Sequence, residues 1–340
     1  MFTRAELQTQ ILNANYQTFD ALALAIFRYQ ATHNSVYASY LKYLKKDISQ
    51  IKFITDVPFM PIGFFKNHKV VTGSLPISTV FESSGTTGIV TSQHHVADTD
   101  WYNAISTHIF EQTYGSLGTF QILALLPSYL ERNNSSLVYM IAQFIQKTNS
   151  TESGFFLHNV DNLLAILQKN TQPCNHSTTL LWGVTFALLD LAESGVDLSF
   201  LRDIPNLIVM ETGGMKGRRR EMLREEVHAT LTQAFGVEVI HSEYGMTELL
   251  SQAYSKGYGV FETPPTMKIL LREINDPFAI FDQTQTQKTG GINVVDLANL
   301  DSCSFIETQD LGRFLALPNS FEVIGRFDNS DVRGCNLMAL

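Results

Sequence analysis

From residue 119 to residue 240, short apolar runs alternate with amphipathic segments. The apolar runs have the length and composition of buried strands, and the amphipathic segments repeat apolar residues at helical spacing. The predicted strands are 120–126, 155–157, 179–182, 207–210 and 237–240, and the predicted helices are 135–146, 160–167, 186–192 and 219–235. Strands that are joined through helices form a mainly parallel sheet with right-handed crossovers. The pattern predicts an α/β fold whose ligand sites lie at the carboxyl ends of the strands.

The segments on either side of this alternating region have a different character. Apolar residues recur at helical spacing between residues 4 and 30, and a shorter helical stretch covers 36–46. Two prolines exclude a regular helix at 57–66, an aromatic segment that we expect to pack the first helices on the core. Beyond residue 260 β-type segments dominate, at 291–297, 304–308 and 321–325. We expect one domain over 1–340, with a helical N-terminal extension (1–55), an α/β core (56–260) and a β-rich portion (261–340).

The overall charge argues against two classes of partner. The 340 residues carry a net charge of -9, which disfavours non-specific binding to nucleic acid or to an anionic membrane. The one basic cluster, at 216–220, is followed by glutamates and is most simply a solvated helix start with internal pairing. The chain shows no secretory signal and no apolar run of membrane-spanning length. We therefore expect a cytoplasmic protein with no stable membrane insertion.

The three cysteines, Cys174, Cys303 and Cys335, lie far apart in the sequence. Their spacing fits neither a disulfide framework nor a structural zinc site. Cys174 and Cys303 are interpreted as core or incidental residues, because free cysteine is among the most buried residue types.

After the apolar segment 77–81 comes a run of small residues, Ser83, Ser84, Gly85, Thr86, Thr87 and Gly88. Glycine lets a backbone come close to a ligand, and such a turn presents amides and hydroxyls to an anion. The run suits a polyphosphate, although an ordinary surface loop has the same composition. It is not a Walker loop, because no lysine follows Gly88, and the chain has no GxGxxG dinucleotide fingerprint.

Later segments carry the side chains that a nucleotide needs. Gly213 and Gly214 follow the predicted strand 207–210 and allow a flat ligand to lie against bare backbone. Tyr244, Thr247 and Glu248 follow the predicted strand 237–240 and supply an aromatic ring, a hydroxyl and a carboxylate for magnesium. Further along, Asp310 is the natural partner of ribose hydroxyls, and Arg326 can reach a ribose or a phosphate. A plain turn, a helix cap or a surface salt bridge explains each segment equally well on its own.

Taken in order, these segments resemble the motifs of the adenylate-forming superfamily. The closest resemblance is to the LuxE-type acyl-protein synthetases of bacterial luminescence, with phenylacetate-CoA ligases next. It rests on 83–88, 127–132, 211–218, 244–248, 310–313 and 325–336, and it spans nearly the whole chain from about residue 55. The resemblance implies the large N-terminal domain of that fold, with helix-flanked, mainly parallel sheets and a β-rich end. It also implies that ATP and Mg²⁺ activate a carboxylic acid to an acyl-AMP, from which a thiol takes the acyl group.

The resemblance assigns the nucleotide to specific residues. The run from Ser83 to Gly88 would hold the β- and γ-phosphates, while Gly213 and Gly214 would flank the adenine. Tyr244 would stack on the adenine, and Asp310, assisted by Arg326, would hold the ribose hydroxyls.

Three further residues would take part in the chemistry. Thr247 would contact the α-phosphate, and Glu248 would bind magnesium. Cys335, close to the end of the chain, would accept the acyl group and pass it to a reductase subunit. A carrier-protein thiol or CoA is the alternative acceptor.

Two departures from the superfamily pattern qualify this assignment. No cation follows Gly88, where the family has a lysine, and we expect the chain to lack the small C-terminal domain that supplies a catalytic lysine. The acyl-protein synthetases are similarly short. Arg326, Lys216 or a partner would then neutralise charge, and a catalytically impaired nucleotide-binding scaffold is a third alternative.

His94 and His95 either face the acyl carboxylate or have a surface or helix-cap role. The aromatic residues at 59–65 and 101–102 suit a fatty or aromatic acid, although core packing explains them as well.

Overall fold

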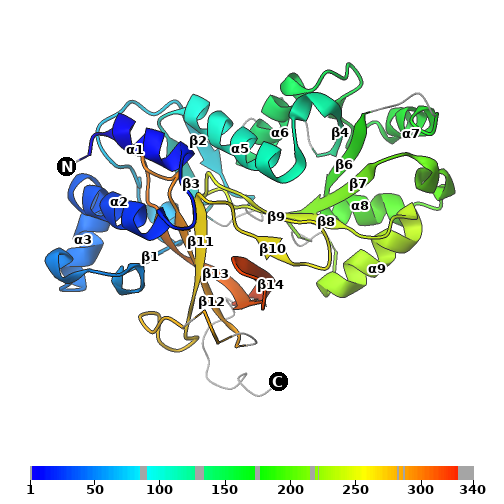
Figure 1. Ribbon diagram of the computed structural model, residues 1–340. Helices are drawn as coiled ribbons and strands as arrows, with labels where there is room; N and C mark the ends of the chain where they lie inside the picture. Colours follow the sequence, from blue (N-terminus) through cyan, green and yellow to red (C-terminus); the bar gives the residue numbers. More distant parts are fainter. Residues whose placement is uncertain are drawn as a thin grey trace.

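The computed structural model describes residues 2–84, 90–126, 134–172, 177–214, 219–220, 222–281, 283–285 and 288–327. A long sheet runs through the molecule, and helices cover it at both ends (Figure 1). The helices are α1 (Arg4–Leu12), α2 (Phe19–His33), α3 (Ser35–Tyr43), α4 (Phe64–Asn67), α5 (Thr99–Tyr114), α6 (Ser136–Lys147), α7 (Val160–Lys169), α8 (Thr185–Ala192) and α9 (Arg224–Phe235). Short 3-10 helices cover Ile48–Gln50, Ile54–Asp56, Leu117–Thr119 and Ser199–Asp203.

The strands fall into one large sheet and one hairpin. They are β1 (Met60–Pro61), β2 (Thr79–Glu82), β3 (Gln93–Val96), β4 (Phe120–Leu125), β5 (Gly154–Phe155), β6 (Thr178–Val184), β7 (Leu207–Thr212), β8 (His241–Tyr244), β9 (Ala253–Ser255), β10 (Phe261–Glu262), β11 (Met267–Arg272), β12 (Gly290–Asp296), β13 (Phe305–Phe314) and β14 (Ser320–Arg326). In the described part of the chain, the large sheet has 12 strands in the order β11-β12-β13-β14-β10-β9-β8-β7-β6-β4-β5, with β1 beside β13. The strands β2 and β3 form the hairpin.

The large sheet has a parallel half and an antiparallel half. Strands β4 to β8 pair in parallel, as the strand–helix alternation predicted. From β8 onwards, through β9, β10, β14, β13, β12 and β11, neighbouring strands are antiparallel. The strand order reverses at β4, since β5 lies on one side of it and β6 on the other. Such a reversal opens a crevice at the carboxyl ends of parallel strands, where ligands bind in α/β folds.

Each strand and helix predicted between residues 120 and 210 is present, with boundaries that differ by a few residues. Two later predictions are wrong in position. The helix predicted at 219–235 begins only at Arg224, where the Glu226 carboxylate accepts a hydrogen bond from the Leu223 amide (3.1 Å) and caps the first turn. The strand predicted at 237–240 lies instead at His241–Tyr244. The prediction followed the apolar residues at 237–240, whereas the residues that pair with β7 are the polar residues His241, Ser242 and Glu243.

The described residues of the basic cluster, Arg219 and Arg220, likewise do not begin a helix. Of its described members, Arg219 lies before α9 and pairs with two carboxylates of the preceding helix region, Asp190 (3.2 Å) and Glu193. The cluster therefore contributes to the contact between α8 and the approach to α9. In the described part of the chain, no helix has both the length and the apolar character that a membrane span requires.

The N-terminal helices pack against the antiparallel half of the sheet. Phe27 and Tyr37 contact Phe305 of β13, with ring centroids 5.9 and 6.3 Å away. The aromatic segment joins them as predicted, because Tyr37 donates to Pro58 O (2.6 Å) and Phe59 packs edge-to-face on Phe305. The prolines exclude helix only up to residue 63, since the short helix α4 follows them.

Candidate active site

The β2–β3 hairpin carries the predicted phosphate loop and is bonded to the residues that lead into α6. Glu82 of β2 pairs in register with Gln93 of β3, which leaves 83–92 as the connecting loop. The Glu82 amide donates to Asn134 O (2.7 Å), and the Asn134 side-chain amide donates to the Glu82 carboxylate (2.6 Å). Asn134 lies between β4 and α6. These two bonds fasten the hairpin to the segment that leads into α6.

Ser83 closes the base of this loop. Its amide donates to Ser92 O (3.0 Å), and its hydroxyl oxygen accepts from the Ser92 amide (2.9 Å). Ser84 is exposed. The remaining predicted members of the loop, Gly85, Thr86, Thr87 and Gly88, lie outside the described residues.

His94 of β3 holds the backbone of Thr247. Its Nδ1 lies 2.8 Å from Thr247 O, and because a carbonyl oxygen only accepts, Nδ1 carries the proton. The ring is buried and packs edge-to-face on Phe65. Burial lowers the pKa of His94 to about 4, so the ring is neutral near pH 7. A surface or helix-cap role for His94 is therefore wrong, and its contact instead places the Thr247–Glu248 segment beside the hairpin.

The Glu248 carboxylate lies next to the base of the phosphate loop. It is 5% exposed and hydrogen-bonds to Ser92, the residue that pairs with Ser83. Asn299 fixes its backbone by donating to Glu248 O (2.6 Å). Burial raises the pKa of Glu248, while the Ser92 hydrogen bond and the charge of Arg326 lower it. A buried carboxylate at this place can hold a cation beside the loop that is predicted to bind phosphates.

Asp310 lies between an aromatic hydroxyl and a guanidinium. Tyr244 donates to its Oδ2 (3.1 Å), and the Arg326 Nε lies 3.0 Å from its Oδ1. Asp310 and Arg326 face each other in register on β13 and β14, so both lie within strands rather than in the turns that the sequence suggested. Burial raises the pKa of Asp310, and the charge of Arg326 and the Tyr244 hydrogen bond oppose this rise. The Tyr244 ring packs edge-to-face on Phe261 and Phe321.

The ends of β7 and β8 bring the glycine pair next to Tyr244. Thr212 and Glu243 are register partners, and the Thr212 hydroxyl donates to the Glu243 carboxylate. Gly213 and Gly214 follow directly, with φ of 75° and 62°. These angles lie in the left-handed region that side chains disfavour, and a Cβ built on Gly214 would meet nothing within 4 Å. The pair therefore forms a turn with open space beside it.

The buried carboxylate of Glu211, two residues before this turn, is held by a network of hydrogen bonds. Glu211 accepts hydrogen bonds from Thr185 (2.6 Å) and Arg224 (3.2 Å), and His228 lies 3.6 Å from the same carboxylate. Burial acts to raise the pKa of Glu211, but the hydrogen bond from His228, the charge of Arg224 and the Thr185 and Ser242 hydroxyls together lower it to about 2. The sequence marked the segment that contains Glu211 but gave no signal for this network, whose members come from α8, α9 and β8.

We expect Glu211→Gln to lower the stability of the protein in a pH-dependent way. The folded pKa lies below the ordinary value of about 4.3, so Glu211 contributes stability above that pH and loses it as the pH falls toward about 2. The expected loss is about 2 to 3 kcal/mol at pH 7. Thermal melts of both proteins from pH 7 to the lowest pH that permits folding will test this. The exposed Glu225→Gln on α9, the helix that supplies Arg224 and His228, is the control, and a melting difference that does not shrink below pH 4 contradicts the prediction.

Several predicted residues lie outside the described part of the chain. These are Cys174, Lys216, Cys335 and the segment 127–132. Cys303 is described and is a core residue, as expected, because it is fully buried and burial raises the pKa of its thiol to about 12. Trp101 is also a core residue, and its indole donates to Ala298 O (2.9 Å).

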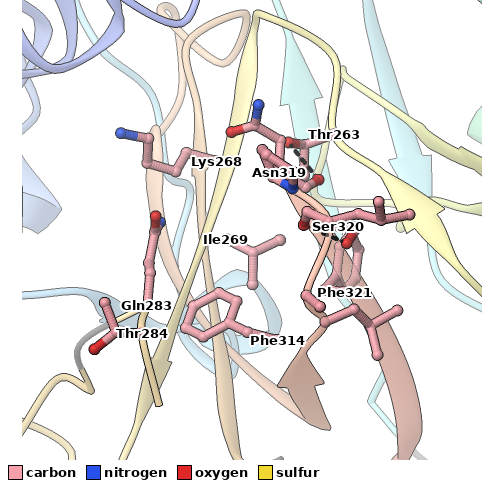
Figure 2. A pocket seen from close by; sticks show the side chains of 13 residues that line it. Thr263, Lys268, Ile269, Gln283, Thr284, Phe314, Asn319, Ser320 and Phe321 are labelled. Atoms are coloured by element: carbon pink, nitrogen blue, oxygen red, sulfur yellow. Dashed lines mark hydrogen bonds between the residues drawn. The ribbon is translucent and has the colours of Figure 1, made fainter. Parts of the chain in front are cut away.

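A cavity of about 250 Å³ lies apart from this constellation (Figure 2). It is bounded by β11, the segment at 283–284 and the turn between β13 and β14, and it contains none of the predicted site residues. Its lysine, Lys268, is already paired with Asp20. One residue of its lining, Phe321, packs on Tyr244.

Comparisons with known proteins agree with the motif order. The profile of the acyl-protein synthetase family LuxE matches residues 9–339. A 2-hydroxyisobutyryl-CoA ligase, solved in the postadenylation state with R3-HIB-AMP, has a similar fold with a TM-score of 0.64 and 13% identity. That match covers 96% of this chain and 72% of the ligase. An acyl acid amido synthetase bound to 2,4-DB matches with a TM-score of 0.50 and 12% identity, over 95% of this chain and 70% of the other.

At these identities the structural matches establish the fold alone, and they confirm the predicted α/β adenylate-forming fold. A search of curated protein sequences gave no significant match.

Proposed function

Since the chain belongs to the LuxE acyl-protein synthetase family of adenylate-forming ligases, we propose that it activates a carboxylic acid with ATP and transfers the acyl group to a thiol, first that of Cys335. Activation of an acid and acyl transfer are the general activity of this family. The observation that carries the proposal is the meeting of separate motifs at one edge of the sheet. Ser83 at the hairpin base and the carboxylate of Glu248 both bond to Ser92, and Tyr244, four residues before Glu248, donates to Asp310, which pairs with Arg326.

ATP would lie across this edge, with its parts held by different strands. The loop that begins at Ser83 would bind the β- and γ-phosphates, and Thr247 would contact the α-phosphate. Asp310 would accept hydrogen bonds from the ribose hydroxyls, with Arg326 beside it. The turn at Gly213–Gly214, the neighbour of Tyr244, would leave room for the adenine. Transfer of an adenylyl group requires mainly positioning and charge neutralisation, which such a frame can supply.

Glu248 fits a magnesium ion by its chemistry. Magnesium in nucleotide sites is bound through one or two carboxylates together with substrate phosphates, rather than by a cage of protein ligands. Glu248 is a single buried carboxylate beside the phosphate loop, and it hydrogen-bonds to Ser92. When bound, the ion would neutralise phosphate charge. The protein's own share is to hold the carboxylate in place through Asn299 and His94.

The proposed reaction has two half-reactions, adenylation of the acid and transfer of the acyl group. A carboxylate oxygen of the acid bonds to the α-phosphorus of ATP, the bond from that phosphorus to the bridging oxygen breaks, and pyrophosphate leaves. The thiolate sulfur then bonds to the acyl carbon, the bond from that carbon to the phosphate oxygen breaks, and AMP leaves. Arg326 is a cation at the site and its side chain is 68% exposed, so it is available to the charge that develops on the phosphate.

We expect Cys335→Ser to abolish covalent acyl labelling while leaving activation intact. Incubation with ATP, Mg²⁺ and a panel of fatty and aromatic acids, followed by intact-mass spectrometry, should show one acyl adduct on the wild-type protein and none on the variant. Acid-dependent exchange of pyrophosphate into ATP should persist in both proteins, because exchange precedes transfer to the thiol. Cys303→Ser is the control, since that thiol is buried.

Other results of the same experiment would identify the alternatives. An unchanged adduct on Cys335→Ser would end the acyl-cysteine proposal. Acyl transfer to CoA or to a carrier-protein thiol without any adduct would indicate a ligase with a separate acceptor. ATP binding without exchange for any acid would indicate a nucleotide-binding scaffold.

A further inference from the structure

Arg272, the last residue of β11, is a buried cation close to Asp310. The residue is 5% exposed. Its Nη1 donates to Ile292 O (2.9 Å) and to Asn293 Oδ1 (2.8 Å), and its Nη2 donates to Thr308 O (2.7 Å). The one carboxylate paired with it among the described residues is Glu307, at 3.6 Å. Burying a guanidinium this deeply costs desolvation free energy. We therefore expect a function of Arg272 in the residues to which it donates hydrogen bonds.

The neighbouring strand β12 has an irregular register and a glycine at the point where the Arg272 guanidinium lies. The register of β12 against β13 shifts between Gly291 and Asn293, so Ile292 has no register partner on β13. The Ile292 carbonyl accepts instead from Arg272 and from the Thr308 hydroxyl (2.7 Å). A Cβ built on Gly291 would lie 2.5 Å from the Arg272 Cζ. Only glycine therefore allows the guanidinium to lie across the strand at this point.

The same guanidinium reaches the backbone that carries Asp310. Thr308, whose carbonyl accepts from Arg272, offers its hydroxyl oxygen to the Asp310 amide (3.1 Å). On the other side, the Arg272 guanidinium lies 5.3 Å from the centre of the Phe327 ring. The Phe327 amide in turn donates to Gln309 O (2.8 Å). The stretch from Thr308 to Asp310 is thus held by Arg272 directly and through Phe327.

We infer that Arg272 is a positioning residue, which fixes the Asp310 carboxylate for the ribose hydroxyls of ATP. This inference rests on the proposed role of Asp310. Arg272 acts through hydrogen bonds to Ile292 and Asn293 of β12 and to Thr308 of β13, and through its charge. These contacts together hold the backbone that carries the buried Asp310 carboxylate.

The charged and titratable groups around Asp310 come from several elements. They are Tyr244 of β8, Glu248 after β8, Arg272 of β11 and Arg326 of β14, while Glu307 of β13 pairs with Arg272. Burial raises the pKa of Asp310, and Arg326, Tyr244 and Arg272 lower it. Water screens the charge of Arg326, which is mostly exposed, more than it screens the charge of buried Arg272. Loss of Arg272 therefore moves the pKa of Asp310 upward.

The test compares the affinities of the protein for ATP and for 2′,3′-dideoxy-ATP, which lacks both ribose hydroxyls. The wild-type protein should prefer ATP by about tenfold or more, because hydrogen bonds to a charged group are strong. Arg272→Met should lose most of this preference, and Arg272→Lys, which keeps the charge but not the planar fork, should lose part of it. Asn170→Ala is the control for buried hydrogen bonds far from the site, since Asn170 bonds Gln121 and Thr179 between α7 and the sheet. It should keep the wild-type preference.

A pH series adds a readout that a purely structural role would not move. The preference for ATP requires ionised Asp310, so it should disappear as the pH falls through the pKa of that group. In Arg272→Met this loss should occur at a higher pH than in the wild-type protein. If Arg272→Met does not fold, Arg272→Lys decides the question through its affinity ratio.

The outcomes separate the inference from the proposed function. If Asp310→Asn loses the preference but both Arg272 variants keep it, the inference falls and the ribose role of Asp310 stands. If both nucleotides weaken equally in the Arg272 variants, Arg272 is structural only and the inference falls. If Asp310→Asn keeps the preference, Asp310 does not hold the ribose, and both the site assignment and the inference fall.

Discussion

Glu248→Gln is expected to reduce acid-dependent exchange of pyrophosphate into ATP by about 100-fold or more, the scale seen when a group that stabilises transition-state charge is removed. Glutamine matches the size of glutamate and can still hydrogen-bond to Ser92, so the substitution removes charge with little change in packing. The neutral amide is a poor ligand for magnesium, and the apparent affinity for Mg²⁺ should fall by about 10- to 100-fold. Initial exchange rates across a range of Mg²⁺ concentrations measure both effects.

A second carboxylate next to the same loop provides the control. Glu82 ends β2, and its carboxylate accepts from Asn134 and Gln93. Glu82→Gln should change the exchange rate little, because no charge on the substrate is assigned to it. Equal losses in the two variants would mean that the rate depends on the fold of the hairpin rather than on the Glu248 charge. Wild-type exchange in Glu248→Gln would remove Glu248 from the site.

The parallel half of the fold could be predicted from the sequence because its signals are local. The strand Phe120–Leu125 is wholly buried and reads as one apolar run, and α6 repeats its apolar residues at helical spacing. The strand β8 could not be predicted from such local signals. Its buried residues, Ser242 and Glu243 among them, are polar and have partners on other elements, so nothing in the local sequence marks them as a strand.

The site could be predicted only as far as its motifs are contiguous. Tyr244, Thr247 and Glu248 are neighbours in sequence, whereas the contact of Asp310 with the Tyr244 hydroxyl joins residues 66 positions apart and was not predicted. The residues that hold them are single and distant. His94 and Asn299 reach Thr247 and Glu248 across 153 and 51 residues of sequence, and neither belongs to a recognisable motif. Contacts of this kind appear only when the chain is folded.

Asp296→Ala should have the largest effect on stability of any single substitution considered for this protein. The fully buried carboxylate accepts hydrogen bonds from the Leu250 amide (2.8 Å), the Ser251 amide (3.0 Å) and hydroxyl (2.7 Å), and the Ala298 amide (3.0 Å). Alanine would leave three buried amides without an acceptor, at a cost of about 4 kcal/mol or more. Asp296→Asn keeps one acceptor oxygen and should lose about half as much. Thermal melts of the two variants measure the order of the losses.

The effect should extend to the nucleotide, because Leu250 and Ser251 lie only two and three residues after Glu248 in the chain. ATP affinity should fall in Asp296→Ala even at temperatures where the variant is folded. Asp301→Ala is the matched control, since that carboxylate accepts two hydrogen bonds from the side chain of Arg4, which is 25% exposed, and losing this pair should cost about 1 to 3 kcal/mol. If Asp296→Ala and Asp301→Ala have the same melting temperature, the four hydrogen bonds of Asp296 do not hold the segment at Leu250 and Ser251 in place. If Asp296→Ala is destabilised but keeps its ATP affinity, that segment folds correctly without the carboxylate, and Glu248 owes its position to His94 and Asn299 alone.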